Sequence, residues 1–197
     1  RLEKEVIQAC RSWKDDYASL LVETFGEAQG TNVLSEFPDA FPAGYRERFA
    51  AHSAVVDMQH LLSLSAERKL VMSFYQPLAS TEQQLHCKLY HADSPLALSD
   101  VLPILENLGL RVLGEFPYRL RHQNGREFWI HDFAFTYAEG LDVDIQELND
   151  TLQDAFVHIV EGAAENDGFN RLVLTAAMPW REVALLRAYA RYLKQIR

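Results

Sequence analysis

The stretch from Gly109 to Tyr137, GLRVLGEFPYRLRHQNGREFWIHDFAFTY, is the part of the sequence that most constrains the fold. Two runs with alternating side chains flank the pair Asn124-Gly125, and Asn-Gly between alternating apolar residues predicts a β-hairpin. Both faces of the second run are largely apolar, which is typical of a strand with neighbours on both sides. We therefore expect a hairpin whose second strand is central in a sheet.

The segments around this hairpin predict the rest of the sheet. KLVMSFYQ, from Lys69, and QLHCKLYHA, ending at Ala92, are short and rich in β-formers. A short helix over residues 98–108 follows, with Ser99 as its N-cap and Gly109 as its C′ residue. A longer helix through Leu148 and Phe156 comes after the hairpin. The order strand, helix, strand, strand, helix is that of a split βαβ, ferredoxin-like antiparallel sheet, here with one extra strand before it.

Helices are also expected at both ends of the chain, which gives an α+β fold class. The opening residues have apolar positions at steps of three and four and predict a helix that ends near Gly26 or Gly30. SEFPDAFPAGYRERF predicts an irregular, extended connection anchored by Phe37 and Phe41. A helix with Ala51, Val55, Met58 and Leu62 on one stripe follows, and Pro179 opens a last helix. We expect three parts: residues 1–66, 67–165 and 166–197.

Composition excludes several classes of protein. The chain has 197 residues, is 48% hydrophobic and has no apolar run of about 18 residues, so we expect a globular protein without a membrane span. Two cysteines, Cys10 and Cys87, are too few for a disulfide framework, which favours the cytoplasm. The formal charge of −9 argues against nucleic-acid binding through phosphates.

The sequence contains none of the common catalytic signatures. GLRVLG, from Gly109 to Gly114, has the glycine spacing of a phosphate loop, but Glu115 and Phe116 stand where Lys and Ser/Thr are required. No G-x-G-x-x-G, G-x-S-x-G, H-E-x-x-H or C-x-x-C is present. We therefore predict no catalytic residue and no bound cofactor in this chain.

Three local patterns have a plain structural interpretation beside the functional one. Cys87 and His91 lie about 13 Å apart on a strand, too far to share a metal ion, so we predict no metal site. His131 and Asp132 are sequential on a strand and point to opposite faces, so they cannot form a catalytic dyad. REFWIHDFAF is similar to the aromatic strand of RNA-recognition modules, but it lacks their glycine.

Four segments together resemble the large bacterial NAD-specific glutamate dehydrogenases, in the region before the catalytic domain. These are SEFPDAFPAGYRERF, LPILENLGLRVLGEFPYRLR, GREFWIHDFAFTY and FNRLVLTAAMPWREVALLRAYARYLKQIR. The resemblance covers essentially the whole chain and implies an ACT-like domain followed by the start of a helical region. It implies a parent enzyme that oxidises glutamate to 2-oxoglutarate and ammonia with NAD, whose catalytic residues lie in a later part of the chain. This piece would then serve allosteric regulation or assembly in amino acid catabolism.

The resemblance also implies an effector site, because ACT domains bind small effectors, often amino acids, near the first strand-to-helix turn. That turn is HADSPLALS, where Asp93 and Ser94, the backbone at Leu96, and Ser99 could hold an amino acid. A plain turn without a ligand is the other interpretation, since Pro95 removes a donor. The alternative for the whole chain is a stand-alone ACT-type amino-acid-sensing module.

The last helix is expected to dock onto the remainder of its own chain. Val183, Leu186, Ala190 and Leu193 form its expected inward stripe, and Arg187, Arg191 and Lys194 form its expected outward basic set. The segment from Arg181 onward contains five basic residues and one acidic residue, so its net charge is positive whereas that of the rest of the chain is negative. We expect the parent to be a homo-oligomer.

Overall fold

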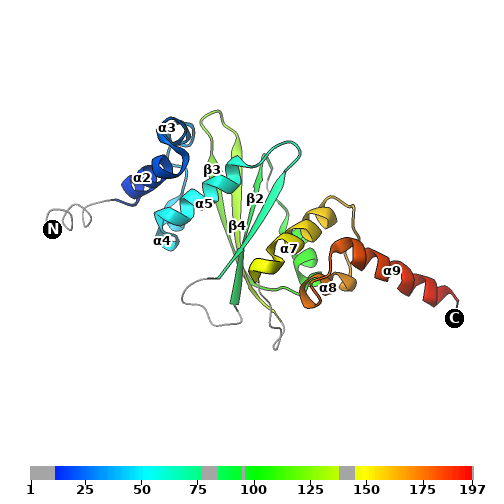
Figure 1. The fold of residues 1–197 in the computed structure, drawn as a ribbon. Helices are drawn as coiled ribbons and strands as arrows, with labels where there is room; N and C mark the ends of the chain where they lie inside the picture. The colour runs from blue at the N-terminus through cyan, green and yellow to red at the C-terminus, as the bar shows by residue number, and fades with distance from the viewer. Residues whose placement is uncertain (1–11, 77–83, 95, 138–144, 197) are drawn as a thin grey trace. The chain divides into compact units, whose positions relative to one another are not determined.

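The computed structural model describes residues 12–76, 84–94, 96–137 and 145–196, and Figure 1 shows their fold. The chain divides into two compact units, each with its own buried side chains. The first unit combines residues up to 69 with 90–94 and 117–130, and the second combines 70–89, 95–116 and 131–197.

Four antiparallel strands form one sheet in the order β1-β2-β4-β3. Its strands are β1 (Leu70–Tyr75), β2 (Gln84–Ala92), β3 (Arg111–Arg121) and β4 (Glu127–Thr136). β4 lies between β2 and β3, which confirms both the central strand and the ferredoxin-like order. The extra strand β1 pairs with the other side of β2.

The turn between β3 and β4 follows from its Asn-Gly pair. Gly125 has a φ of 88°, a left-handed conformation that glycine adopts without strain. The Asn124 side chain accepts a hydrogen bond from the backbone N–H of Arg126 at 2.9 Å, and the N–H of His122 donates to the carbonyl of Arg126. The predicted hairpin is therefore confirmed.

In the second unit, helices α6 (Leu98–Asn107) and α7 (Ile145–Val160) pack with the sheet, and α7 contacts β1 (Figure 1). Alternate residues of a strand share a face, so β2 and β4 each send every second side chain into this core. The strand residues buried there are Leu85, Cys87, Leu89, Phe133 and Phe135. The predicted inner stripe of α7 is confirmed for Leu148, Leu152, Phe156 and Ile159, all of which are buried.

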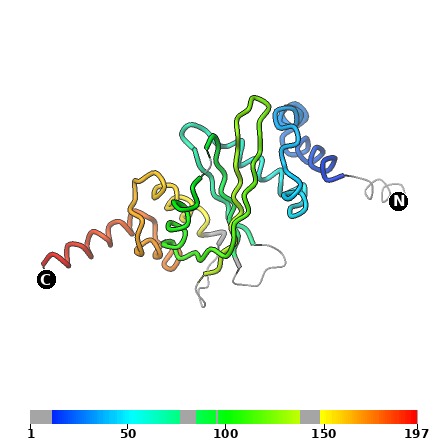
Figure 2. Tube along the Cα trace, turned by 180° about the vertical axis from the view of Figure 1, so that it is seen from behind, coloured from blue at the N-terminus to red at the C-terminus, as the bar shows by residue number. Residues whose placement is uncertain are grey.

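The end of the chain forms three short or exposed elements in the same unit. These are η1 (Gly168–Asn170), α8 (Arg171–Thr175) and α9 (Trp180–Gln195). α9 begins after Pro179, as predicted, and its last turns extend beyond the rest of the unit (Figures 1 and 2).

The cap of α6 differs from the prediction. Its N-cap is Ala97, which makes no side-chain cap, and Ser99 lies inside the first turn instead of capping it. The helix begins two residues earlier than a cap at Ser99 would require, since Ala97 has the extended backbone of a cap. At the other end Gly109 has a φ of +93°, which confirms it as the residue that ends the helix.

In the first unit, α2 (Trp13–Phe25) packs against α3 (Glu27–Glu36) and α5 (Ala51–Leu62). Ser12 and Asp15 form a capping box that fixes the start of α2, and Gly26, with a φ of 84°, ends it. The predicted end near Gly26 is confirmed; the part of the predicted helix before Ser12 lies outside the described residues.

Helix α3 was not predicted, because two nearby glycines were interpreted only as helix breakers. Gly30 is instead a packing residue inside α3: a Cβ added there would lie 2.8 Å from Cα of Val22. The two helices approach each other this closely only because position 30 has no side chain.

The extended connection predicted over residues 35–49 is wrong in its second half. Phe37 and Phe41 are buried as expected, but α4 (Ala43–Arg48) forms after Pro42. A helix of this length is unstable alone, so its order must come from tertiary packing, above all of the fully buried Tyr45.

The inward stripe of α5 is also shifted at its end. Ala51, Val55 and Met58 are buried as predicted, but Leu61 is buried in place of the exposed Leu62. The surprise on this helix is Asp57, which is 2% exposed. Its carboxylate accepts hydrogen bonds from the hydroxyls of Tyr45 and Tyr90, so the charge is held by two donors inside an aromatic core.

Candidate functional site

The predicted effector turn starts at the end of β2, in the first unit. Asp93 has a φ of 75°, a conformation that residues other than glycine rarely adopt. Its carboxylate accepts two hydrogen bonds from the Arg126 guanidinium, at 2.7 and 3.0 Å, and these bonds hold the pKa of Asp93 below its ordinary value. An ammonium group of an effector would therefore have to replace or join Arg126.

The remaining predicted effector residues are Ser94, Leu96 and Ser99. Ser94 belongs to the first unit, and its N–H donates to the carbonyl of Ala92. Leu96 and Ser99 belong to the second unit, where Leu96 packs on the core and the Ser99 hydroxyl lies 3.3 Å from the Asp100 carboxylate. Pro95 lies outside the described residues, and the effector site stays a prediction.

Arg187 contradicts the predicted outward basic face of α9. It is 4% exposed and buried against the segment before α8. Its Nε and Nη2 atoms donate to the Asp167 carboxylate at 2.7 and 3.0 Å, and Nη2 also donates to the Asn170 side chain at 2.7 Å. The helix is therefore fixed to its own unit by a bidentate ion pair whose arginine is buried, and bidentate pairs are among the strongest hydrogen-bonded arrangements of side chains.

The contact with Arg187 helps to lower the pKa of the Asp167 carboxylate. Burial by itself would raise the pKa of Asp167, but the hydrogen bonds from Arg187 and from the backbone N–H of Phe169 outweigh that effect and lower it. The sequence offered no spacing signal for this pair, since the partners are 20 residues apart and on different elements.

The other two residues of the predicted basic set behave differently. Arg191 is exposed and forms an ion pair with Glu165, and Lys194 is exposed. The predicted inward stripe is also wrong beyond Val183, because Leu186 and Leu193 are exposed. The buried residues of α9 are Val183 and Arg187, which lie one turn apart. No other described element covers the later turns of the helix.

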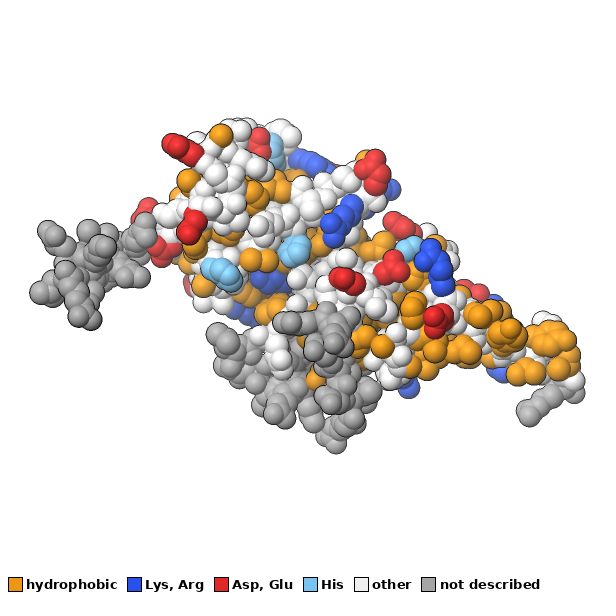
Figure 3. All heavy atoms as spheres, viewed as in Figure 1, with side chains coloured by type: hydrophobic (Ala, Val, Ile, Leu, Met, Phe, Trp, Pro, Cys, Tyr) orange, Lys and Arg blue, Asp and Glu red, His pale blue; other side chains and the backbone are white. Residues whose placement is uncertain are grey.

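α9 consequently presents an apolar surface to its surroundings. Leu185, Tyr189, Tyr192 and Ile196 follow one another at steps of four, three and four and share a face. Their exposed fractions are 56%, 59%, 60% and 62%, and Figure 3 shows hydrophobic side chains gathered along this helix. We call these four residues the α9 apolar face.

His131 and Asp132 serve separate polar groups, as opposite faces of β4 require. The His131 imidazole lies 2.7 Å from the Glu115 carboxylate. Asp132 is fully buried and accepts a hydrogen bond from the Tyr75 hydroxyl at 2.8 Å, with the His86 ring 3.6 Å away. The pair is therefore part of the hydrogen bonding of the sheet and not a dyad.

Residues 12–76, 84–94, 96–137 and 145–196 contain neither a metal-binding cluster nor a reactive thiol. No group of three or more His, Cys, Asp and Glu side chains in those ranges could hold a metal ion. Cys87 is buried in the core, and this burial raises the pKa of its thiol well above the ordinary value, which makes it a poor nucleophile.

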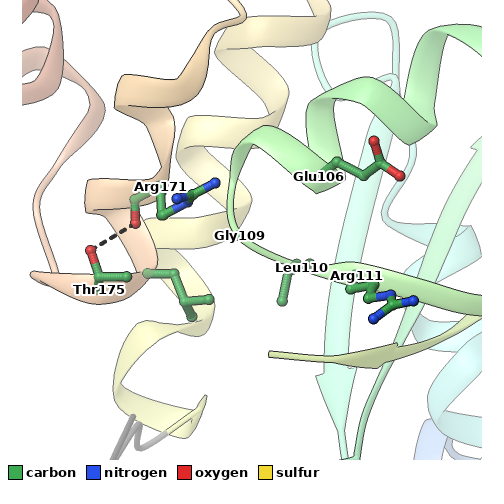
Figure 4. Close-up of a pocket in the computed structure, with 7 residues that line it drawn as sticks. Glu106, Gly109, Leu110, Arg111, Arg171 and Thr175 are labelled. Atoms are coloured by element: carbon green, nitrogen blue, oxygen red, sulfur yellow. Dashed lines mark hydrogen bonds between the residues drawn. The ribbon is translucent and has the colours of Figure 1, made fainter. Parts of the chain in front are cut away.

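A hollow of about 500 Å³ lies beside the Gly109 turn in the second unit (Figure 4). Arg171 and Thr175 of α8 lie on one side, and Glu106 and Arg111 on the other. None of the three charged side chains has a hydrogen-bond or ion-pair partner within the part of the chain that the structure describes. Figure 4 shows the two guanidinium groups on either side of the turn, so they do not converge on one anion.

Comparisons with known proteins connect this fold to one family. Residues 69–148 match the model of the glutamate dehydrogenase ACT3 domain. Residues 20–64 match that of glutamate dehydrogenase helical motif 2, and residues 164–197 that of helical motif 3.

Relatives from three bacteria carry the same name, NAD-specific glutamate dehydrogenase. The chain is 85% identical to that of Pseudomonas aeruginosa and 45% identical to that of Halomonas elongata, each over its whole length. It is 28% identical to that of Mycobacterium tuberculosis over 99% of its length. It spans 12% of the length of each of these relatives. No helix among the described residues is long and apolar enough to cross a membrane.

Proposed function

Since this chain belongs to the family of the large NAD-specific glutamate dehydrogenases, we propose that it is a non-catalytic regulatory and assembly region of such an enzyme. The observation that carries the proposal is the 85% identity over the whole chain to a much longer relative. The chain spans only 12% of that relative. The parent reaction would be the oxidation of L-glutamate by NAD to 2-oxoglutarate, ammonia and NADH.

The residues of this region support the proposal that catalysis takes place in another part of the parent chain. Dinucleotide binding in an α/β fold needs a glycine-rich turn at a helix N-terminus, and the sequence has no such fingerprint. The buried polar groups are instead used in the fold: Asp132 with Tyr75, Asp57 with two tyrosines, and Arg187 with Asp167. NAD and glutamate would bind in another part of the parent chain.

A direct assay tests this proposal. The 197-residue chain, mixed with glutamate and NAD, should form no NADH, while the full-length enzyme does. NADH formation by the chain alone, at any rate above that of a heat-denatured sample, contradicts the proposal.

The α9 apolar face is the part of this region that we propose for assembly. Fully burying an exposed large apolar side chain stabilises a protein by about 1.5–3 kcal/mol, and side chains that are already partly covered, like these, would gain part of that. Four such residues on one face are therefore expected to pack against another segment of the parent chain or of a second subunit. The exposed Arg191 and Lys194 would lie at the edge of that contact, where the interaction should weaken with salt.

Two charge-introducing variants of the full-length enzyme separate the apolar face from the basic residues. Tyr189→Glu should impair assembly or activity, because a carboxylate cannot be buried without a partner. Lys194→Glu should act more weakly and only at low salt, and Gln195→Glu is the control that adds the same charge elsewhere on the exposed helix. Assembly is measured by light scattering after size-exclusion chromatography. If Tyr189→Glu assembles and turns over like Gln195→Glu, the apolar face is merely solvated.

An amino-acid effector at Asp93, Ser94, Leu96 and Ser99 is a second candidate function. The observation that favours it is the left-handed backbone of Asp93, since strained residues gather at ligand sites. Calorimetry with the common amino acids on the full-length enzyme, repeated with Asp93→Ala, tests it. Unchanged binding in that variant removes the site. We also propose that the parent enzyme is a homo-oligomer and lies in the cytoplasm.

A further inference from the structure

A small cavity in the first unit has features of a ligand site that the proposed function does not use. It has a volume of about 90 Å³ and lies between α2, the segment that follows α3, and α4. Trp13, Tyr17 and Phe41 form an aromatic wall: Trp13 stacks on Tyr17 with ring centroids 5.4 Å apart, and Phe41 meets Tyr17 edge-on at 5.4 Å.

Two buried hydrogen-bond donors line this cavity. The hydroxyl of Tyr17 and the Nε–H of Arg46 are shielded from solvent, and neither has a partner within the described ranges. Tyr17 as a whole is 6% exposed. Buried polar groups in native proteins are nearly always satisfied, so two orphaned donors at one cavity indicate that something with acceptor atoms occupies it.

Side chains near the cavity do not supply that acceptor. The Asp57 carboxylate is held by Tyr45 and Tyr90. The Asp39 carboxylate forms an ion pair with Lys14 at the rim; the charge of Arg46 also acts on Asp39, but it is Lys14 that forms a hydrogen bond with this carboxylate. Burial, together with the charge of Asp57, raises the pKa of Tyr17, so its hydroxyl keeps its proton and can donate. No acceptor for these two donors is therefore found among residues 12–76, 84–94, 96–137 and 145–196.

The chemistry of the two donors defines the ligand. An Arg Nε–H can only donate and carries a positive charge, so the partner is an acceptor and preferably an anion. The aromatic wall accommodates a short apolar stem but offers it no hydrogen bonds. The volume is that of about three water molecules in the liquid, which limits the ligand to a few heavy atoms.

We propose that this cavity binds a small monocarboxylate of acetate or propionate size. One carboxylate oxygen accepts from Tyr17 and the other from Arg46, and the methyl end lies against the aromatic wall. The site does not depend on the regulatory role of the region, since it is built entirely from α2 to α4 of the first unit.

Calorimetric titration of the full-length enzyme with acetate and propionate tests the proposal. Tyr17→Phe keeps the ring and removes only the hydroxyl, and Arg46→Lys keeps the charge and removes the Nε donor. Each should weaken binding about tenfold or more, as expected for loss of one charge-assisted hydrogen bond. Arg48→Lys, the same substitution on the same helix, is the matched control and should bind like the unaltered enzyme.

Two further ligands sharpen the result. Benzoate should be too large to bind, and methylammonium should be rejected by the charge of Arg46. Equal affinity of acetate for the unaltered enzyme and both cavity variants would place the binding elsewhere. Absence of any carboxylate binding would show that ordered water alone satisfies the two donors. Either result overturns the proposal, and the thermal melting temperature of each variant shows that it is folded.

Discussion

Replacing Arg187 by alanine should loosen α9 from its unit and destabilise the protein by a predictable amount. The substitution removes every hydrogen bond of the guanidinium and leaves the Asp167 carboxylate and the buried Asn170 amide without their main partner. Breaking a fully buried ion pair by removing one partner costs about 3–5 kcal/mol. The Asp167 side chain is 33% exposed, so water can take over part of the role of the guanidinium. We therefore expect a loss of about 2–3 kcal/mol in the free energy of unfolding, a discounted value because exposed charges are screened.

The matched control lies one helical turn further along α9. Arg191 also pairs with a carboxylate, that of Glu165, but the two side chains are 60% and 52% exposed. Exposed pairs contribute about 0–1 kcal/mol, so Arg191→Ala should be nearly neutral. In a protein of this size, each kcal/mol shifts the melting temperature by about 2–4 °C, so the two variants should differ by roughly 4–12 °C.

Urea denaturation followed by circular dichroism gives the free energies, and hydrogen exchange locates the change. Amides of α9 should lose protection in Arg187→Ala, whereas those of the sheet core should keep it. The difference in free energy of unfolding between the unaltered protein and Arg187→Ala also depends on pH. The pKa of Asp167 is lowered in the folded state, so its contribution is present above the ordinary carboxyl pKa of about 3.9 and is lost as the pH falls through the folded value. Equal unfolding midpoints for Arg187→Ala and Arg191→Ala at pH 7 would refute the reasoning.

Three further predictions concern packing. Gly30→Ala should destabilise the protein by about 1–3 kcal/mol by overpacking against the backbone of Val22, whereas Gly44→Ala, at a position open to solvent, should be neutral or stabilising by up to about 1 kcal/mol; only the unfolding midpoint of Gly30→Ala should fall. The thiol of Cys87, buried and with a raised pKa, should resist iodoacetamide at pH 8 until the protein unfolds, and mass spectrometry that finds it alkylated in the native protein would contradict its place in the core. Asp57→Ala should cost about 2–4 kcal/mol, because it leaves two buried tyrosine hydroxyls without their acceptor, and a melting temperature unchanged from the unaltered protein would show that the carboxylate is not needed there.

The strands and the regular helices were predictable because their signals are local. Apolar residues on both faces of β4 place it at the centre of the sheet, and an Asn-Gly pair places its turn, whatever the rest of the chain does. Gly26 and Gly109 end helices through their own backbone freedom, so both ends could be located from the sequence. The split βαβ order follows from the succession of these elements.

Two helices of the first unit could not be predicted, because their causes are not local. α3 depends on the close approach that Gly30 permits, and in a linear sequence the same glycine indicates only a break. α4 is a helix of six residues whose order comes from the burial of Tyr45 among other aromatic rings. A short helix gains too little from its own hydrogen bonds to reveal itself by propensity.

The fold class, the central hairpin and the family could be predicted from the amino acids alone, since alternation, turn residues and segment order are local properties of the chain. The direction in which α9 faces depends on contacts that appear only in the folded protein. The spacing of Arg187, Arg191 and Lys194 is that of a solvated basic face, yet Arg187 points inward, where Asp167 and Asn170 hold it. Apolar periodicity predicts burial only if a surface is present to cover it, and Tyr189 and Ile196 have none among the described residues. A buried charge and an uncovered apolar face are set by partners distant in sequence, which periodicity does not encode.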